Sequence, residues 1–155
     1  MPESKTLTTH VLIVEPDRAV NRRLQRACGR AARVTSCHDF LSARERMLAA
    51  TPDLLITNLR LNEYNGLHLV LLSHATEARP RCIVHTDRPD FRLIKEGQSL
   101  GAFFERTARL PYALPSYLHH QWPPTDNRDP SRFDRRSLFR GGRRASDLEE
   151  LVALS

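Results

Sequence analysis

Short apolar runs alternate along the first 120 residues with segments in which apolar residues recur every three or four positions. The β-branched and aromatic residues of the runs predict five strands, at 10–14, 33–37, 53–57, 82–84 and 101–104. Helices are predicted after Asp17, Asp39, Gly66 and Pro89 and over 111–119, and the two aspartates are expected to cap theirs. A strand followed by a helix, five times over, predicts an α/β doubly wound fold: a parallel sheet with helices on both faces.

The residues that directly follow the strands are the candidates for a functional site. In a parallel sheet of this kind, sites form beyond the carboxyl ends of the strands. The residues at these positions are Glu15, Pro16, Asn58, His85, Thr86, Glu105 and Arg106. Because side chains alternate along a strand, His85 is expected to point away from Thr86 and to pack against a helix.

The composition divides the chain into four segments. Residues 1–9 form a polar N-terminal tail, and residues 10–120 form the folded domain. Residues 121–146 are rich in proline and arginine and lack periodicity, which indicates a linker or tail. Residues 147–155 follow a capping-box pattern that begins at Ser146 and predicts a short helix. The N-terminal segment does not resemble a signal peptide, and no apolar run is long enough to span a membrane, so a cytoplasmic protein is expected.

Charge and cysteine content narrow the functional classes only slightly. The chain of 155 residues has 24 basic and 18 acidic side chains, a net charge of +6. This excess of positive charge is compatible with an acidic partner or a nucleic acid. Three cysteines in a chain without a secretion signal argue against a disulfide framework.

Arginines are concentrated in the C-terminal segment, together with two phenylalanines and a pair of glycines. Such a segment could bind RNA or DNA through phosphate contacts and stacking, dock onto an acidic protein surface, or have no binding role. The arginines concerned are Arg128, Arg132, Arg135, Arg136, Arg140, Arg143 and Arg144.

The residues at the strand ends suggest a family. Residues 11–15 read Val-Leu-Ile-Val-Glu, and residues 52–61 read Pro-Asp-Leu-Leu-Ile-Thr-Asn-Leu-Arg-Leu, with Gly66 eight residues beyond the asparagine. Residues 83–86 read Ile-Val-His-Thr, and residues 101–106 read Gly-Ala-Phe-Phe-Glu-Arg. From about residue 10 to residue 120 this order resembles the receiver domain of bacterial response regulators. The resemblance implies a five-stranded, flavodoxin-like sheet in the order 2-1-3-4-5.

The resemblance also implies a chemistry, from which this chain departs. Receivers take a phosphoryl group from a histidine kinase onto an aspartate, with Mg²⁺ held by further acidic residues and with a lysine and a hydroxyl nearby. Here the acceptor position is Asn58, which is not an anionic nucleophile. Of the metal-binding acids only Glu15 is present, since Pro16 occupies the second position. Thr86 keeps the hydroxyl, and Arg106 replaces the lysine.

These departures predict a receiver-like domain without phosphorylation, a pseudo-receiver that needs no cofactor. Mg²⁺ binding is expected to be lost, because one carboxylate rarely holds this ion alone. Glu15 is expected to pair with Arg106 instead. A receiver that is divergent but still phosphorylated is the alternative.

The predicted role is therefore that of a non-enzymatic signalling module that acts by protein–protein contact. Its partner would be a histidine kinase, another regulator or a second copy of the chain. By resemblance, the contact surface lies on the fourth helix, the fifth strand and the fifth helix. Phe103 occupies the aromatic switch position, and Tyr112 and Tyr117 are the expected interface anchors. Nucleic-acid binding through the arginine-rich tail is the alternative from another class.

Overall fold

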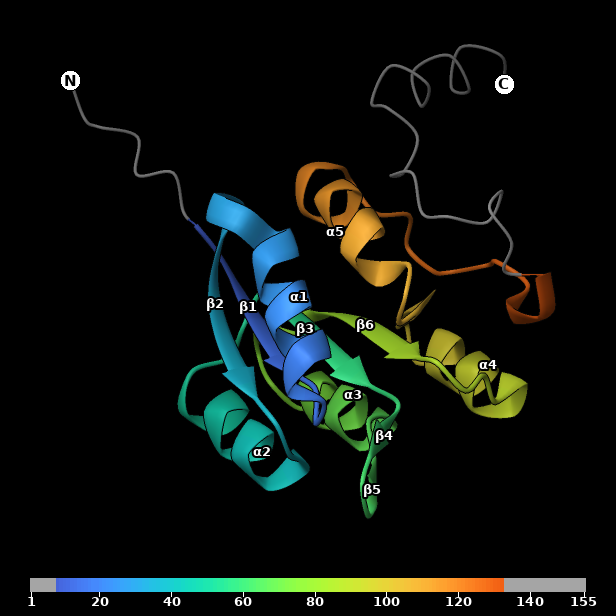
Figure 1. Ribbon diagram of the computed structural model, residues 1–155. Coiled ribbons are helices and arrows are strands. Elements are labelled where there is room, and N and C mark those ends of the chain that lie inside the picture. Colours follow the sequence, from blue (N-terminus) through green and yellow to red (C-terminus); the bar gives the residue numbers. More distant parts are fainter. Residues whose placement is uncertain (1–7, 133–155) are drawn as a thin grey trace, which may run out of the picture.

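A five-stranded parallel sheet forms the centre of the molecule. The computed structural model describes residues 8–132. The sheet contains β1 (Thr9–Val14), β2 (Ala32–Cys37), β3 (Leu54–Asn58), β6 (Arg81–Thr86) and β7 (Phe103–Arg106). Their order across the sheet is β2-β1-β3-β6-β7, and every neighbouring pair is parallel (Figure 1). With these strands numbered along the chain the order is 2-1-3-4-5, so the predicted fold class is confirmed.

Five α-helices cover the two faces of the sheet. Helices α1 (Arg18–Cys28) and α5 (Leu110–His119) pack against each other on one face. Helices α2 (Phe40–Ala49) and α3 (Leu67–His74) cover the other face, next to α4 (Phe91–Ser99). Two short 3₁₀ helices, Gly29–Ala31 and Pro130–Arg132, complete the described part.

The helices begin where the sequence predicts. The Asp17 carboxylate accepts hydrogen bonds from the backbone N–H groups of Ala19 and Val20, and Asp39 accepts one from Ser42. These bonds satisfy N–H groups that have no partner within the helix. Asp90 caps α4 in the same way.

Alternation along β1 divides the core into two layers. Val11 and Ile13 belong to the apolar cluster beneath α1 and α5, and Leu12 and Val14 belong to the cluster beneath α2 and α3. Because β1 is buried on both faces, all four side chains are apolar, as a parallel strand in the middle of a sheet requires.

The chain between β3 and α3 contains regular structure that the sequence did not predict. It contains a small antiparallel hairpin, β4 (Arg60–Leu61) and β5 (Tyr64–Asn65). Leu61 is buried, and the Tyr64 ring stacks on Phe40 with ring centroids 4.3 Å apart. This hairpin forms one wall of the region beyond the end of β3.

The segment that follows α5 packs against the domain, where the sequence predicted a linker. The Trp122 indole donates a hydrogen bond to the carbonyl oxygen of Tyr117, and its ring lies against Phe103. Asp126 accepts a hydrogen bond from the backbone N–H of Phe104, in the edge strand β7. Residues 121–131 therefore cover an edge of the sheet that would otherwise expose unpaired backbone groups.

Some predictions concern residues outside the described part. They are the N-terminal tail up to residue 7, the short helix at 147–155, and the arginines at 135, 136, 140, 143 and 144. Arg132 is described only in its backbone. Within residues 8–132, every helix is too short or too polar to cross a membrane.

Candidate functional site

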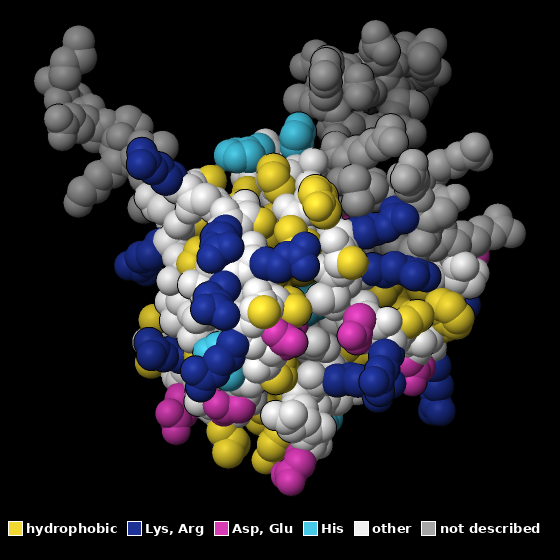
Figure 2. Space-filling model, in the orientation of Figure 1, with side chains coloured by type: hydrophobic (Ala, Val, Ile, Leu, Met, Phe, Trp, Pro, Cys, Tyr) yellow, Lys and Arg dark blue, Asp and Glu magenta, His cyan; other side chains and the backbone are white. Residues whose placement is uncertain are grey.

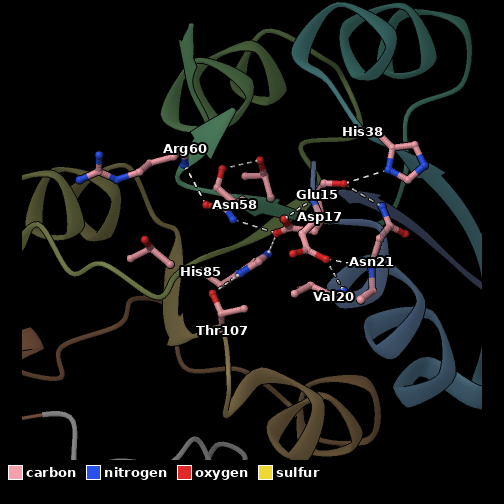
Figure 3. A network of polar contacts seen from close by, with 12 residues as sticks. Glu15, Asp17, Val20, Asn21, His38, Asn58, Arg60, His85 and Thr107 are labelled. Carbon is pink, nitrogen blue, oxygen red and sulfur yellow. Dashed lines mark hydrogen bonds and ion pairs between the residues drawn. The ribbon is translucent and has the colours of Figure 1, made fainter. Parts of the chain in front are cut away.

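A small open cavity lies beyond the carboxyl ends of β1 and β3. Glu15 directly follows β1, and Asn58 is the last residue of β3, so adjacent parallel strands bring the two side chains together (Figure 3). The cavity has a volume of about 390 Å³. Its walls are formed by Glu15, Pro16, Asp17, Val20, Asn58, Arg60, Asn62, Asp87 and Thr107.

The Glu15 carboxylate is buried, and both of its oxygens have donors. Oε1 accepts a hydrogen bond of 2.9 Å from the backbone N–H of Asp17. Oε2 accepts one of 2.8 Å from the side-chain amide of Asn58. Burial raises the pKa of Glu15, while these two hydrogen bonds act in the opposite direction by stabilising the charged form.

Both ends of the Asn58 amide take part in hydrogen bonds. Nδ2 donates to Glu15, and Oδ1 accepts a bond of 2.9 Å from the backbone N–H of Arg60. The nitrogen therefore faces the carboxylate and the oxygen faces the hairpin (Figure 3). A carboxylate at this position could accept from Arg60 but could not donate to Glu15.

The buried ring of His85 lies next to Glu15, a contact that the sequence did not predict. Its ring is fully buried, with Nε2 3.2 Å from Oε2 of Glu15 and Nδ1 2.9 Å from the hydroxyl of Thr107. Burial lowers the pKa of His85 to about 3. The neutral tautomer with a proton on Nε2 fits this environment, since Nδ1 then accepts from Thr107. Parallel pairing places His85 opposite Asn58, a register that the sequence pattern alone does not reveal.

Four of the seven residues predicted for the site do not line the cavity: His85, Thr86, Glu105 and Arg106. The buried Thr86 hydroxyl accepts from the backbone N–H of Arg88 and donates to the carbonyl oxygen of the same residue, so it stabilises the turn after β6. Arg106 is exposed at the end of β7. The expected pairing of Glu15 with Arg106 is wrong, because Asn58, His85 and the Asp17 N–H surround the carboxylate instead.

The resemblance implies a Mg²⁺ ion at this site, but the side chains present do not form a suitable set of ligands for it. Mg²⁺ requires oxygen ligands in octahedral geometry. Each oxygen of Glu15 and Oδ1 of Asn58 already accepts one hydrogen bond, which makes them weaker ligands, and Oδ1 of Asp17 caps α1. Pro16 has no side-chain oxygen. Between residues 8 and 132, no three His, Cys, Asp or Glu side chains are grouped so that they could hold a metal ion.

Two of the three expected interface residues lie in the core. Phe103 and Tyr117 are 3% and 1% exposed, and their rings meet edge to face at 6.1 Å. The Tyr117 hydroxyl donates a 2.6 Å hydrogen bond to Glu105, so this tyrosine has a buried polar partner. Only Tyr112, which is 74% exposed, is available to a partner. Tyr117 shares the buried face of α5 with Leu110, Ala113 and Leu114, at the i, i+3, i+4, i+7 spacing of one helix face, and Tyr112 lies off that face.

Arg128, one of the expected nucleic-acid contacts, has a structural role instead. Its guanidinium lies 2.8 Å from Oε1 of Glu105 and 2.8 Å from Oδ1 of Asp126, and it donates to the carbonyl oxygen of Phe104. Burial raises the pKa of Glu105, and the positive charge of Arg128 counteracts that rise. The arginine thus neutralises a buried carboxylate and holds residues 121–131 against β7.

Comparison with known proteins supports the fold. No family model and no curated protein matches the chain. Among solved structures, the signal receiver domain of a Luxo repressor protein from Vibrio parahaemolyticus is 17% identical, with a TM-score of 0.64 over 94% of this chain and 98% of that one. The chemotaxis protein CheY4 of Vibrio cholerae is also 17% identical, with a TM-score of 0.63 over 72% of this chain and 96% of its own.

A two-component response regulator from Clostridium difficile gives the same result. It is 15% identical, with a TM-score of 0.61 over 71% of this chain and 94% of its own. Identities this low show shared architecture and do not transfer an activity. Sheet order, helix placement and these neighbours together show that the chain has the fold of response-regulator receiver domains.

Proposed function

We propose that this protein is a signalling module with a receiver fold that works through protein–protein contact and is not phosphorylated at position 58. The observation that carries the proposal is the hydrogen bond from the Asn58 amide to the buried Glu15 carboxylate. This bond depends on a property that an amide has and a carboxylate lacks, the ability to donate a hydrogen bond. The acceptor position is thus built around the amide.

The chemistry of phosphoryl transfer supports this proposal. An acyl phosphate forms when a carboxylate oxygen attacks phosphorus, and a neutral amide is a poor nucleophile for that step. Metal ions normally neutralise the charge that develops on the phosphoryl oxygens. Here Pro16 supplies no ligand, and the oxygens of Glu15 face hydrogen-bond donors.

A role in protein contact agrees with the surface of α4 and α5. Phe91 on α4 is 45% exposed and Tyr112 on α5 is 74% exposed, and aromatic side chains are frequent anchors in protein interfaces. The proposed partner is a histidine kinase, another regulator or a second copy of this chain. Such a role places the protein in the cytoplasm and requires no catalytic activity.

Phosphorylation is tested by incubating the full chain with acetyl phosphate and Mg²⁺ and measuring its intact mass. We expect the mass to remain unchanged, while a receiver with an aspartate acceptor in the same reaction gains a phosphoryl group. A base-labile gain of one phosphoryl group by this chain would overturn the proposal and favour a divergent, phosphorylated receiver.

Protein contact is tested by capture experiments with extracts of the native cell. Wild-type protein is compared with a Phe91→Ala/Tyr112→Ala variant, whose substitutions are exposed and leave the core intact. We expect one signalling protein to be retained by the wild type and lost with the variant. Equal retention by both proteins would exclude this surface as the contact.

A further inference from the structure

The positive charge of the described domain is concentrated on one layer of the fold. Residues 18–38, which form α1 and β2, contain six arginines and no acidic residue. Residues 106–125, which include α5, contain two arginines and no acidic residue. Because α1 and α5 pack side by side on the same face of the sheet, the two acid-free segments form one surface layer (Figure 1).

The segment that forms the other helix layer is balanced in charge. Residues 39–100, which include α2, α3 and α4, contain eight acidic and eight basic side chains. An arginine-rich composition alone would spread the excess charge over both layers. The asymmetry therefore reflects placement on the fold; in Figure 2 basic side chains are spread over the face that carries α1, several of them over this helix.

The exposed side of α1 presents a row of arginines. Arg18, Arg22 and Arg26 follow one another at four-residue intervals, about 6 Å apart along the helix axis. Arg23 lies beside this row, and Arg30 follows in the next turn. All five are exposed, and within residues 8–132 none of them forms an ion pair. Their charges are thus available to a partner.

We propose that this surface, the α1 arginine row, binds the phosphate backbone of a nucleic acid. A guanidinium group forms bidentate hydrogen bonds with phosphate oxygens, and a rigid helix fixes several such groups at regular spacing. Contacts of this kind supply most of the affinity in binding that does not depend on base sequence. The proposal goes beyond the signalling role and does not depend on it.

The surface fits phosphates better than it fits an acidic protein. Protein interfaces have a centre that is depleted in charge and rich in large apolar side chains. Between Arg18 and Arg30 no large apolar side chain is exposed, whereas Tyr112 on the neighbouring α5 and, on the opposite layer, Leu41, Leu48 and Leu71 are exposed. The row therefore lacks the apolar centre that a protein partner would need.

Fluorescence anisotropy with two labelled probes tests the proposal in the full chain. The probes are a single-stranded DNA and a duplex DNA of about 20 nucleotides per strand, titrated between about 50 and about 200 mM salt. The variant Arg18→Gln/Arg22→Gln/Arg26→Gln removes the row and keeps a good helix former at each position. The matched control, Arg44→Gln/Arg46→Gln/Arg92→Gln, removes the same charge from exposed positions on the opposite layer.

We expect the row variant to bind at least about tenfold more weakly at the lowest salt, and the control to stay within about threefold of the wild type. The slope of log K against log salt should become shallower by about 2 for the single strand and about 3 for the duplex, the values for three lost phosphate contacts. Circular dichroism checks that both variants are folded. The probe with the larger loss identifies the preferred strand form.

Three results would overturn the proposal. The first is no binding of either probe by the wild type at the lowest salt. The second is an equal loss of DNA affinity in both variants, which would assign the binding to net charge. An unchanged DNA affinity of the row variant would count in the same way, because it would assign the binding to other residues, such as 133–155. The third is binding of polyglutamate as tight as binding of DNA, which would indicate an acidic protein as the partner.

Discussion

Replacing Asn58 by aspartate probes the contact on which the proposed function depends. In the native protein the Asn58 amide donates to Oε2 of Glu15 at 2.8 Å. The substitution removes this donor and places a second carboxylate beside a buried one. The size of the side chain hardly changes, so the effect is one of charge and hydrogen bonding.

The loss of folding stability in Asn58→Asp is limited because one of the two carboxyls can take up a proton. Losing a hydrogen bond to a charged group costs about 1.5–3 kcal/mol. Two negative charges 2.8 Å apart repel by about 6 kcal/mol at an effective dielectric constant of about 20. Keeping one carboxyl protonated at pH 7 costs only about 4 kcal/mol, since its ordinary pKa is near 4. The protonated carboxyl can also donate a hydrogen bond, as the amide of Asn58 did. We therefore expect about 3–4 kcal/mol of destabilisation at pH 7.

The loss of stability caused by Asn58→Asp should depend strongly on pH. Two carboxyls in one site raise the folded-state pKa above the value in the unfolded chain, as burial already does for Glu15 in the native protein. A raised folded pKa leaves stability intact at low pH and removes it as pH rises through that pKa. The destabilisation should thus fall to about 1 kcal/mol at pH 5 and be largest at pH 8.

Urea unfolding of wild type and variant at pH 5, 7 and 8 measures this dependence. The control is Asn62→Asp, since Asn62 is exposed in the same cavity and its change adds the same charge. Adding Glu15→Gln to Asn58→Asp should recover part of the loss, because the repulsion disappears. A destabilisation below about 1 kcal/mol at pH 8, or one that is independent of pH, would refute the proposed Asn58–Glu15 interaction.

Three further predictions concern phosphorylation of this variant and two other contacts in the fold. Asn58→Asp should gain no phosphoryl group from acetyl phosphate and Mg²⁺, because Pro16 still provides no metal ligand; strong labelling in an intact-mass measurement would contradict this. Arg128→Ala should lower the free energy of unfolding measured in urea by about 3 kcal/mol, since the buried carboxylate of Glu105 loses its positively charged partner. The control Arg106→Ala, at an exposed position, should lower it by less than about 0.5 kcal/mol. Gly66→Ala should cost about 1–3 kcal/mol, because its Cβ would overlap the carbonyl oxygen of Asn58; an unchanged Tm would count against this.

The chain's local patterns were enough to predict its architecture. The apolar runs and the amphipathic segments each depend on residues a few positions apart, and they predicted the five main strands, the helices and the caps at Asp17 and Asp39. Glu15 and Asn58 were identified by the same reasoning, because a residue that ends a buried strand lies at a known edge of the sheet. Strand boundaries differed by one or two residues, since the ends are determined by pairing.

The tertiary structure alone decided which side chains meet. His85 reaches Glu15 because β6 pairs with β3 in one particular register, and a shift of one residue would have turned it to the other face. Arg128 is 23 positions from Glu105 in the chain, and no local pattern relates the two. The partner of the Tyr117 hydroxyl, Glu105, was likewise decided only by the packing of α5 against β7. Such contacts form only when the whole sheet has assembled, whereas the periodicity of a sequence depends only on residues that are near one another in the chain.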